Sequence, residues 1–327
     1  MLSVIGVMGA GEKKIFKKKN NDICLRIMTG ALIDKFFDAV VMQEDVNCIN
    51  NLAYFFKPAK KKQNIRFKGE DVNLGKKVLS KGTRIQSKHL GLLLSLGIER
   101  VDVYKKIKIA IISTGSELIN QGNNLKNGEV YYCTGPMIKC VVENYGAEVV
   151  DLKKVEDDFG KIKFCVKNGL KYDVLVVIGG ISVGMFDFVK RVFESLGVKE
   201  IFHKGSWRPG KPLFFGDFNG KPVFGLPGNP VAAYIIANVF IKKCLNKMQN
   251  VSNELMWEMN KLTHGFTKKA EVTQFMQSIV NEGKVSILPG QGSHKIATLA
   301  KSNAICWLEQ GVTEIKKGTL VKTMLSS

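Results

Sequence analysis

The chain has 327 residues, of which 45% are hydrophobic and 24% are charged, and its net charge at neutral pH is +20. This composition is typical of a globular protein with room for more than one core, and no apolar run is long enough to span a membrane. The positive charge favours anionic ligands, but the lysines are spread along the chain without a zinc-finger or RNA-binding aromatic motif, so we predict no nucleic-acid partner. Seven scattered cysteines without a CxxC pair argue against a disulfide framework or a zinc site, and we expect reduced thiols in a cytoplasmic protein.

The N-terminal part of the chain predicts a small β domain. Its apolar start lacks a basic region, which favours a first strand over a signal peptide. Turn residues separate further short runs of strand-like composition. These runs are residues 23–28, 39–43, 52–56 and 64–68. A helix is then predicted over residues 87–96, with Ser87 as its N-cap and Gly97 as its stop.

From Lys105 onward, strands and helices alternate, which predicts a parallel sheet with helices on both faces. The predicted strands are 108–112, 147–152 and 173–178, and the predicted helices are 136–145, 158–168 and 186–196. Such sheets bind ligands at the carboxyl ends of their strands.

A strand-rich pattern returns after Leu255 and predicts a small barrel or sandwich. Its predicted strands are 268–275, 278–280, 285–288, 304–308 and 319–323. The predicted fold class is therefore a multidomain α/β plus β protein with a central parallel α/β domain. The expected domains are a β domain (1–66), a helical linker (67–104), the α/β domain (105–250) and a C-terminal β barrel (251–327).

A glycine-rich loop, GGISVG, follows the strand that ends at Ile178. Glycines let backbone N–H groups approach an oxyanion, and a helix N-terminus favours negative charge. A tight strand-to-helix turn is the alternative interpretation, but three glycines in six residues exceed what a turn needs. The loop predicts an anion site made by Gly179, Gly180, Ser182 and Gly184.

A second glycine turn, formed by Ser113, Thr114 and Gly115, ends another predicted strand, and Glu117 follows it. Asp157 or Asp158 comes after a third strand, and Asp187 follows the GGISVG loop. Carboxylates beside a phosphate loop are suitable ligands for Mg²⁺. The topology therefore predicts a metal site at this rim, although an N-cap or a solvated turn would explain any one of these acids alone.

Two proline-containing turns complete the candidate site. The RPGKP turn places Arg208 and Lys211 on a rigid segment, where they can meet an oxyanion or can be an exposed basic turn. The GLPGNP segment contains Pro227 and Pro230, with Asn229 suited to a helix N-cap. Its backbone can also line a ligand.

These motifs occur together with CLRIMTGA, DAVVMQED, RFKGEDVNLGKKVLSKGT and GQGSH in one order along the chain. The chain as a whole resembles the molybdopterin molybdenumtransferases of the bacterial MoeA type, which are related to the gephyrin E domain. The resemblance implies an α/β domain like that of the molybdopterin adenylyltransferase, between flanking β domains. It also implies an elongated homodimer with an active site between subunits, and the preceding adenylyltransferase is a candidate partner.

The reaction implied by the resemblance is the insertion of molybdate into adenylylated molybdopterin with release of AMP, assisted by magnesium. By match to the family's motifs, Thr29, Asp71, Glu117, Asp157 and Asp187 are implied as active-site residues. The glycine loop is implied to bind the nucleotide and pterin, and Arg208, Lys211 and Ser293 to face molybdate. Turn or loop positions are the alternative roles of Thr29 and Ser293, and His294 is expected to be a loop residue.

The chain departs from the family pattern in several places. We find no segment like Asn-Ser-Ala-Met-Asp-Gly-Tyr-Ala, whose aspartate serves the active site, and the chain is therefore expected to be N-terminally truncated. Residues 33–37 replace a Pro-x-Gly turn. An Asp-x-Asn pattern is replaced by Tyr132, Cys133 and Thr134, and an arginine near Phe275 is replaced by Gln277.

These departures leave two alternatives to the molybdenum-inserting enzyme. The first is a non-catalytic homologue that binds pterin or serves as a scaffold. The second is a molybdopterin adenylyltransferase, because the α/β domain is shared between the two steps, although the flanking β domains argue against it.

Overall fold

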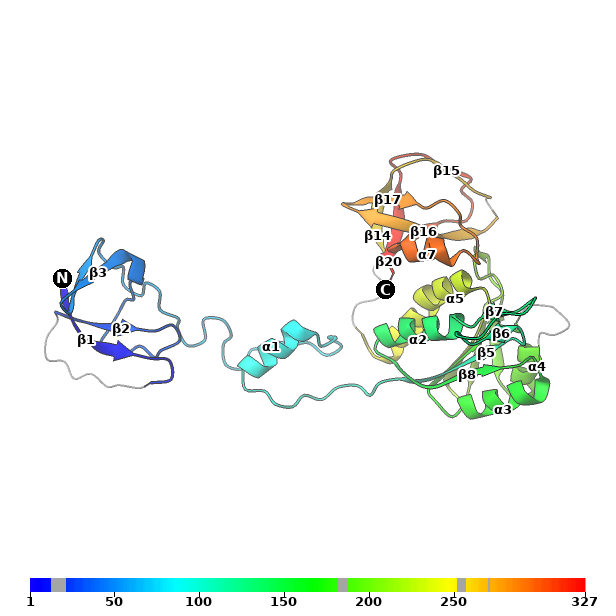
Figure 1. The fold of residues 1–327 in the computed structure, drawn as a ribbon, viewed down its shortest axis with the longest axis horizontal. Helices are drawn as coiled ribbons and strands as arrows, with labels where there is room; N and C mark the ends of the chain where they lie inside the picture. Colours follow the sequence, from blue (N-terminus) through cyan, green and yellow to red (C-terminus); the bar gives the residue numbers. More distant parts are fainter. Residues whose placement is uncertain (13–21, 182–187, 252–256, 270, 327) are drawn as a thin grey trace. The chain divides into compact units, whose positions relative to one another are not determined.

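The computed structural model describes residues 1–12, 22–181, 188–251, 257–269 and 271–326. The chain divides into two compact units, Met1–Leu79 and Ser80–Ser327 (Figure 1). In the described ranges, no helix is both long and apolar enough to cross a membrane.

The first unit is built on a four-stranded sheet with the order β2-β1-β4-β3. Its elements are β1 (Leu2–Met8), β2 (Ile23–Ile27), the short helix η1 (Gln43–Asp45), β3 (Val46–Ile49) and β4 (Leu52–Phe55). The predicted strands at 39–43 and 64–68 are wrong. Asn64 has a left-handed backbone (φ 55°), and its side-chain amide donates to the carbonyl of Val40 at 3.0 Å, so these two segments pair as irregular loops.

The second unit begins with helix α1 (Ser87–Ser95), which confirms the predicted helix but not its cap. Gln86, not Ser87, is the N-cap. The Gln86 backbone N–H donates to Nδ1 of His89 at 3.1 Å, and the Gln86 side chain bonds the backbone at His89 in return, which is a capping-box arrangement.

The α/β domain is organised around a six-stranded sheet with the order β10-β12-β13-β9-β5-β8. Strands β8, β5, β9 and β13 are parallel; β12 pairs antiparallel with β13, and β10 pairs antiparallel with β12. The strands are β5 (Lys108–Thr114), β8 (Glu148–Val155), β9 (Val174–Ile178), β10 (Lys199–His203), β12 (Phe214–Phe218) and β13 (Lys221–Leu226). The helices are α2 (Thr134–Asn144), α3 (Phe159–Gly169), α4 (Phe188–Ser195), α5 (Pro230–Ile236), the π-helical turn η2 (Ala237–Ile241) and α6 (Lys242–Met248), and β6 (Leu118–Ile119) pairs with β7 (Val130–Tyr131).

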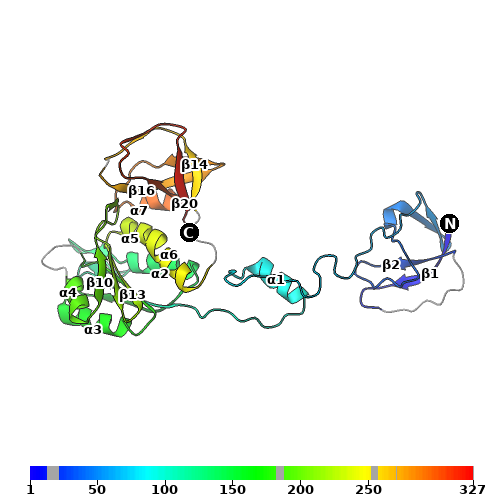
Figure 2. The same ribbon diagram turned by 180° about the vertical axis from the view of Figure 1, so that it is seen from behind.

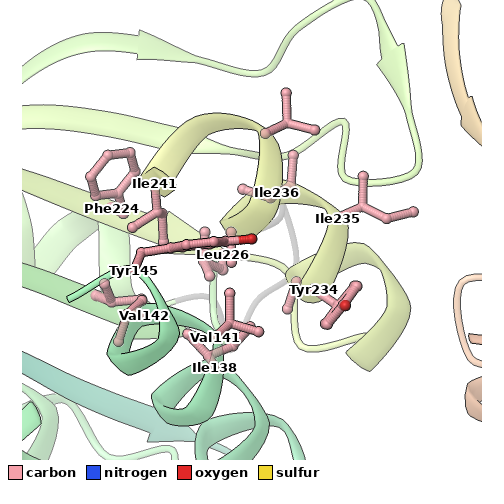
Figure 3. Close-up of a cluster of buried hydrophobic side chains, with 14 of the residues drawn as sticks. Ile138, Val141, Val142, Tyr145, Phe224, Leu226, Tyr234, Ile235, Ile236 and Ile241 are labelled. Carbon is pink, nitrogen blue, oxygen red and sulfur yellow. The ribbon is translucent and has the colours of Figure 1, made fainter. Parts of the chain in front are cut away.

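Both faces of this sheet are covered, as the predicted parallel architecture requires (Figures 1 and 2). Along β5, Ile109 and Ile111 belong to a core with α2 and α5, whereas Ala110 and Ile112 belong to a second core with α3 and α4. Figure 3 shows the first of these cores, where side chains of α2 meet those of α5, η2 and β13. The continuous apolar composition of β5 follows from this burial on two sides.

The C-terminal domain is a closed barrel of five strands, in the order β16-β17-β14-β20-β18 with β18 returning to β16. Its elements are β14 (Glu258–Leu262), β16 (Thr273–Asn281), β17 (Lys284–Ile287), α7 (Ile296–Lys301), β18 (Ala304–Leu308) and β20 (Leu320–Leu325), and β15 (Phe266–Thr267) pairs with β19 (Glu314–Ile315). Strand β11 (Trp207–Arg208), which comes from the α/β segment of the chain, pairs in parallel with β16. The predicted fold class, an α/β domain flanked by a β domain and a barrel, is confirmed.

Aromatic side chains join the α/β domain to the barrel. The ring of Phe240, in η2, lies 4.9 Å from that of Trp207 and 6.5 Å from that of Phe275 in β16 (centroid distances). Phe275 also contacts Trp307 of β18 at 5.6 Å. Because aromatic contacts of this kind add to the free energy of burial, we infer that the two domains are held together as one compact unit.

Truncation of this aromatic junction is expected to destabilise the second unit. Phe240→Ala should lower the free energy of unfolding by about 2 kcal/mol or more, because a partly buried ring is lost from between Trp207 and Phe275. Phe164→Ala, at a ring that is 67% exposed on α3, is the control and should change stability by less than about 0.5 kcal/mol. Urea unfolding followed by tryptophan fluorescence measures both, and equal effects would contradict the inferred role of the junction.

Candidate functional site

The candidate site lies at the carboxyl edge of the central sheet. Strands β5, β9 and β13 are parallel neighbours, and their carboxyl ends align: Ser113, one residue before the end of β5, pairs with Ile178, and Ile178 pairs with Leu226. The segments that leave these strands therefore start side by side. The N–H of Gly179 donates to the carbonyl of Leu226 at 2.9 Å, which ties two of these segments together.

The glycines at the end of β9 are required by close packing against Thr114. Gly179 has φ +91°, and a Cβ there would lie 2.6 Å from the Thr114 carbonyl oxygen. A Cβ on Gly180 would lie 2.9 Å from the Val189 side chain and 3.1 Å from Thr114 Oγ1. Any larger residue at these two positions would push the loop away from β5.

Thr114 contributes a buried hydroxyl to this corner. Its side chain is 6% exposed, and its Oγ1 is buried without a hydrogen-bond partner. A buried polar atom without a partner is costly, so the hydroxyl is a group that a bound ligand can satisfy. The predicted Ser182, Gly184 and Asp187 lie outside the described residues.

Two of the predicted carboxylates lie around the turn after β5. The Glu117 carboxylate folds back over Gly115, where an added Cβ would be 2.7 Å from it. The Asp157 carboxylate accepts from the Ser116 N–H at 3.2 Å, and the Ser116 hydroxyl accepts from the Asp157 N–H at 3.1 Å. These contacts place Asp157 on the same turn as Glu117.

Asp158, the alternative metal ligand, has a structural task. Its side chain caps α3 by accepting from the Lys161 N–H at 2.8 Å. Asp157 is therefore the acid that remains for the rim. Within the described ranges, no group of three His, Cys, Asp or Glu side chains is close enough to hold a metal ion. The two carboxylates that are described supply hard oxygen donors of the kind Mg²⁺ prefers.

Tyr132 occupies the space beside Ser113 at the start of α2. The side chain is 8% exposed, and its hydroxyl oxygen accepts from the Ser113 hydroxyl at 3.3 Å. A Cβ on Gly135 would overlap the phenol oxygen, so Tyr132 and Gly135 fit together. Burial raises the pKa of the phenol, which outweighs the opposite effect of the Ser113 hydrogen bond. The phenol is therefore neutral at physiological pH.

A separate pocket of about 420 Å³ lies between the RPGKP turn, the GLPGNP segment and the barrel. Arg208, Lys211, Pro227 and Ser293 all line it, so the structure brings four of the predicted ligand residues together. The barrel contributes residues 274–277 and Gln291. None of the described residues that line the pocket is acidic. The pocket is therefore suited to an anion.

The close-packed residues Thr114, Gly179 and Gly180 form a glycine corner. The segment 227–229 borders both this glycine corner and the pocket. Pro227 and Asn229 line the pocket, while a Cβ on Gly228 would lie 3.8 Å from Gly179 Cα. Helix α5 starts next to it with Asn229 as N-cap and Pro230 at its first turn, as predicted. The Ser293 carbonyl accepts from the Val231 N–H at 3.1 Å and so holds the barrel loop on this helix start.

Thr29 and Asp71 belong to the first unit, where both are exposed. Thr29 lies in the turn after β2, next to Gly30 with φ +86°, and Asp71 lies in an irregular segment. His294 is an exposed loop residue of the second unit.

The sequence motifs did not indicate every residue of the site. Tyr132 and Gln277 were noted only as departures from a family pattern, and Gln291 was not singled out although it lies within the GQGSH motif. The amide of Gln291 holds its loop on β16: it accepts from the Gln277 N–H at 2.9 Å and donates to the Gln277 carbonyl at 2.8 Å.

Three family models match the chain in the order of its domains. The MoeA N-terminal region (domain I and II) matches residues 6–97, the probable molybdopterin binding domain matches 110–247, and the MoeA C-terminal region (domain IV) matches 260–325. The order of these matches is that of a MoeA-type protein, with a central domain that matches the probable molybdopterin binding domain.

Relatives of known name and structure agree with these matches. The molybdopterin molybdenumtransferase of Staphylococcus epidermidis is 33% identical over 339 residues, which cover 99% of this chain and 78% of the relative. That of Staphylococcus aureus is 32% identical over 330 residues, with the same coverage. A molybdopterin biosynthesis MoeA protein from Pyrococcus horikoshii OT3 superposes with a TM-score of 0.79 at 28% identity, over 99% of this chain and 80% of that one.

The chain belongs to the molybdopterin molybdenumtransferase family. The predicted family, the assignment to molybdenum cofactor biosynthesis and the enzyme class, a transferase, are confirmed.

The glycine corner gives a test of the site's geometry. Gly179→Ala should lower the free energy of unfolding by about 2–3 kcal/mol, because the new Cβ meets the Thr114 carbonyl and the backbone is left-handed. Gly197→Ala is the control, because Gly197 also has a left-handed backbone (φ +79°) but open space around it. Only the strain of the left-handed conformation remains there, so its free energy of unfolding should fall by about 1 kcal/mol. Chemical denaturation measures both, and a Gly179 variant no worse than its control would show that the corner is not tightly packed.

Proposed function

We propose that this chain inserts molybdate into adenylylated molybdopterin and releases AMP, with Mg²⁺ assisting. The observation that carries the proposal is the position of segment 227–229. This segment borders both the glycine corner and the cationic pocket, which is the pocket lined by Arg208 and Lys211. A nucleotide-pterin ligand at the corner and an oxyanion in the pocket would be neighbours across this segment, as the insertion of one into the other requires.

The corner supplies groups that suit a phosphorylated ligand. The backbone at Gly179 and Gly180 can approach an anion closely because neither residue has a side chain. The unpartnered hydroxyl of Thr114 can bond the ligand, and Ser113 lies beside it at the end of β5. Gly115 keeps the adjoining turn compact under the Glu117 carboxylate. We assign the nucleotide and pterin to these residues together with Ser182 and Gly184.

The pocket supplies groups that suit a tetrahedral dianion. Arg208 and Lys211 bring two positive charges, and Ser293 lies on the barrel side of the same pocket. The prolines at 227 and 230 fix the wall between the two ligands and the start of α5. Because the lining has no carboxylate among its described residues, its field attracts an anion.

The carboxylates at the rim are the magnesium ligands that we propose. Glu117 and Asp157 share one turn, and Asp187 is the third ligand that we propose. An ion held there would neutralise charge on the phosphate of the departing AMP. The chain's own contribution is to hold the phosphate against the loop and to keep the carboxylates oriented, as the Ser116–Asp157 hydrogen bonds do.

The first unit is proposed to act through Thr29 and Asp71 in a homodimer whose active site lies between subunits. Exposed apolar side chains are available for an interface of this kind. They include Phe56 and Leu74 in the first unit and Leu90 and Leu94 on α1. The adenylyltransferase that produces the substrate is the proposed partner.

A non-catalytic pterin-binding homologue is the second candidate. Tyr132 favours it, because a buried neutral phenol stands where the family pattern has an aspartate. Such a protein would bind adenylylated molybdopterin without turning it over, so a binding measurement beside an AMP-release assay separates the two candidates.

Removal of a rim carboxylate tests the proposed metal site. Glu117→Ala should reduce molybdate-dependent AMP release by about 100-fold or more, because a ligand to the ion that stabilises the leaving phosphate is lost. Because Glu117 is exposed, we expect the substitution to leave the fold unchanged. Circular dichroism checks this. Glu148→Ala, at the amino end of β8 and opposite the rim, should retain activity within about twofold. Full activity of the Glu117 variant would remove this carboxylate from the mechanism.

Neutralising the RPGKP turn tests the proposed oxyanion pocket. Lys211→Ala should raise the Kd for molybdate about tenfold, with the Kd for adenylylated molybdopterin within about twofold, because Lys211 lines the pocket that we assign to the oxyanion. Lys199→Ala on the edge strand β10 is the charge-matched control and should change neither value. Calorimetry at fixed ionic strength measures the Kd of each ligand. An equal loss of the two affinities for Lys211→Ala would contradict the assignment.

A further inference from the structure

The described start of the GGISVG loop, residues 179–181, is held by strand β13 at two points. The Gly179 N–H donates to the Leu226 carbonyl at 2.9 Å. Two residues further on, the side chain of Ile181 lies over Gly225, where an added Cβ would be 2.9 Å from Ile181 Cγ2. Ile181 is 3% exposed and belongs to the core that also contains residues of β12. The start of the loop therefore passes over β13 towards β12.

A side chain from β10 holds the loop at a third point. Nε2 of His203 lies 3.0 Å from the carbonyl oxygen of Ile181. Because a carbonyl oxygen only accepts, Nε2 carries a proton and donates it to this hydrogen bond. His203 is the last residue of β10, is partly buried and pairs with Phe214 of β12, and the centroids of their two rings are 6.2 Å apart. The donor therefore belongs to a rigid part of the sheet.

The backbone after His203 is held separately from this side chain. The Lys204 N–H donates to the Leu213 carbonyl at 2.9 Å, and the Gly205 N–H donates to the Lys211 carbonyl at 3.1 Å. These backbone hydrogen bonds can form with any side chain at position 203. Among the described residues that line the cationic pocket, His203 does not occur. The imidazole therefore acts on the glycine loop and not on the pocket.

We propose that His203 is a positioning residue for the nucleotide-pterin ligand, which acts through its hydrogen bond to the Ile181 carbonyl. The inference rests on the proposed function, in which the ligand binds at the glycine loop. A carbonyl oxygen that faced an anionic ligand would repel it, and the hydrogen bond keeps this oxygen on the imidazole. A loop that is already ordered also binds more tightly, because less conformational entropy is lost on binding.

The test uses His203→Phe, which keeps a ring beside Phe214 and removes the donor. The full chain is titrated with adenylylated molybdopterin and, separately, with sodium molybdate. We expect the Kd for adenylylated molybdopterin to rise about tenfold and the Kd for molybdate to stay within about twofold. His203→Gln is the conservative variant, because its amide nitrogen can donate to the same carbonyl. It should keep the Kd for adenylylated molybdopterin within about threefold of that of the unmodified chain.

Gln249→Leu is the matched control for lost stability. The Gln249 amide also donates to a backbone carbonyl, that of Tyr145 at 3.1 Å, but at the end of α2 opposite the site. Because each variant removes one side-chain donor from a carbonyl, His203→Phe and Gln249→Leu should each lower the Tm by about 2–4 °C. Gln249→Leu should leave both Kd values within about twofold, since a general loss of stability does not select one ligand.

Three results would overturn the role of His203. They are an unchanged Kd for adenylylated molybdopterin in His203→Phe, an equal weakening of both ligands in that variant, and a His203→Gln variant as weak as His203→Phe. Each of them leaves the proposed function in place if the unmodified chain binds adenylylated molybdopterin. Failure of the unmodified chain to bind this ligand would overturn the proposed function and the inference with it.

Discussion

The alignment of β5, β9 and β13 is the constraint on which the candidate site depends. Because these strands are parallel neighbours in register, their carboxyl ends meet at one edge, and the loops that follow must share a small space. The contact between Gly179 and the Thr114 carbonyl, too close for any side chain, shows how tightly that space is filled. Gly179 and Gly180, the Glu117 turn and the 227–229 segment all take their positions from this edge.

The barrel adds the second half of the site. The aromatic contacts around Phe240 hold it on the α/β domain, and the parallel pairing of β11 with β16 fixes the RPGKP turn against it. Arg208 and Lys211 therefore face barrel residues across one pocket. Residues of two domains line the pocket, whereas the glycine corner is formed by the α/β domain alone.

The sequence was sufficient for the features that local chemistry determines. Apolar runs located β5 and β9, and the Asn229-Pro230 pair located the start of α5, because burial and capping leave direct marks on composition. It failed where partners are distant in the chain. The loops at 39–43 and 64–68 pair irregularly with each other. The start of α1 was mispredicted for a local reason, because Gln86 and His89 form a capping box one residue before Ser87. Likewise, no pattern could show that the side-chain oxygen of Gln277 is buried without a hydrogen bond, since its burial arises from barrel closure.

The proposed reaction requires an oxyanion site that borders the glycine corner across segment 227–229. Anomalous diffraction at the molybdenum absorption edge, from crystals soaked in molybdate, locates such a site. We expect one strong peak between the side chains of Arg208 and Lys211, on the side of Ser293. An empty pocket with molybdenum bound elsewhere on the chain would contradict it.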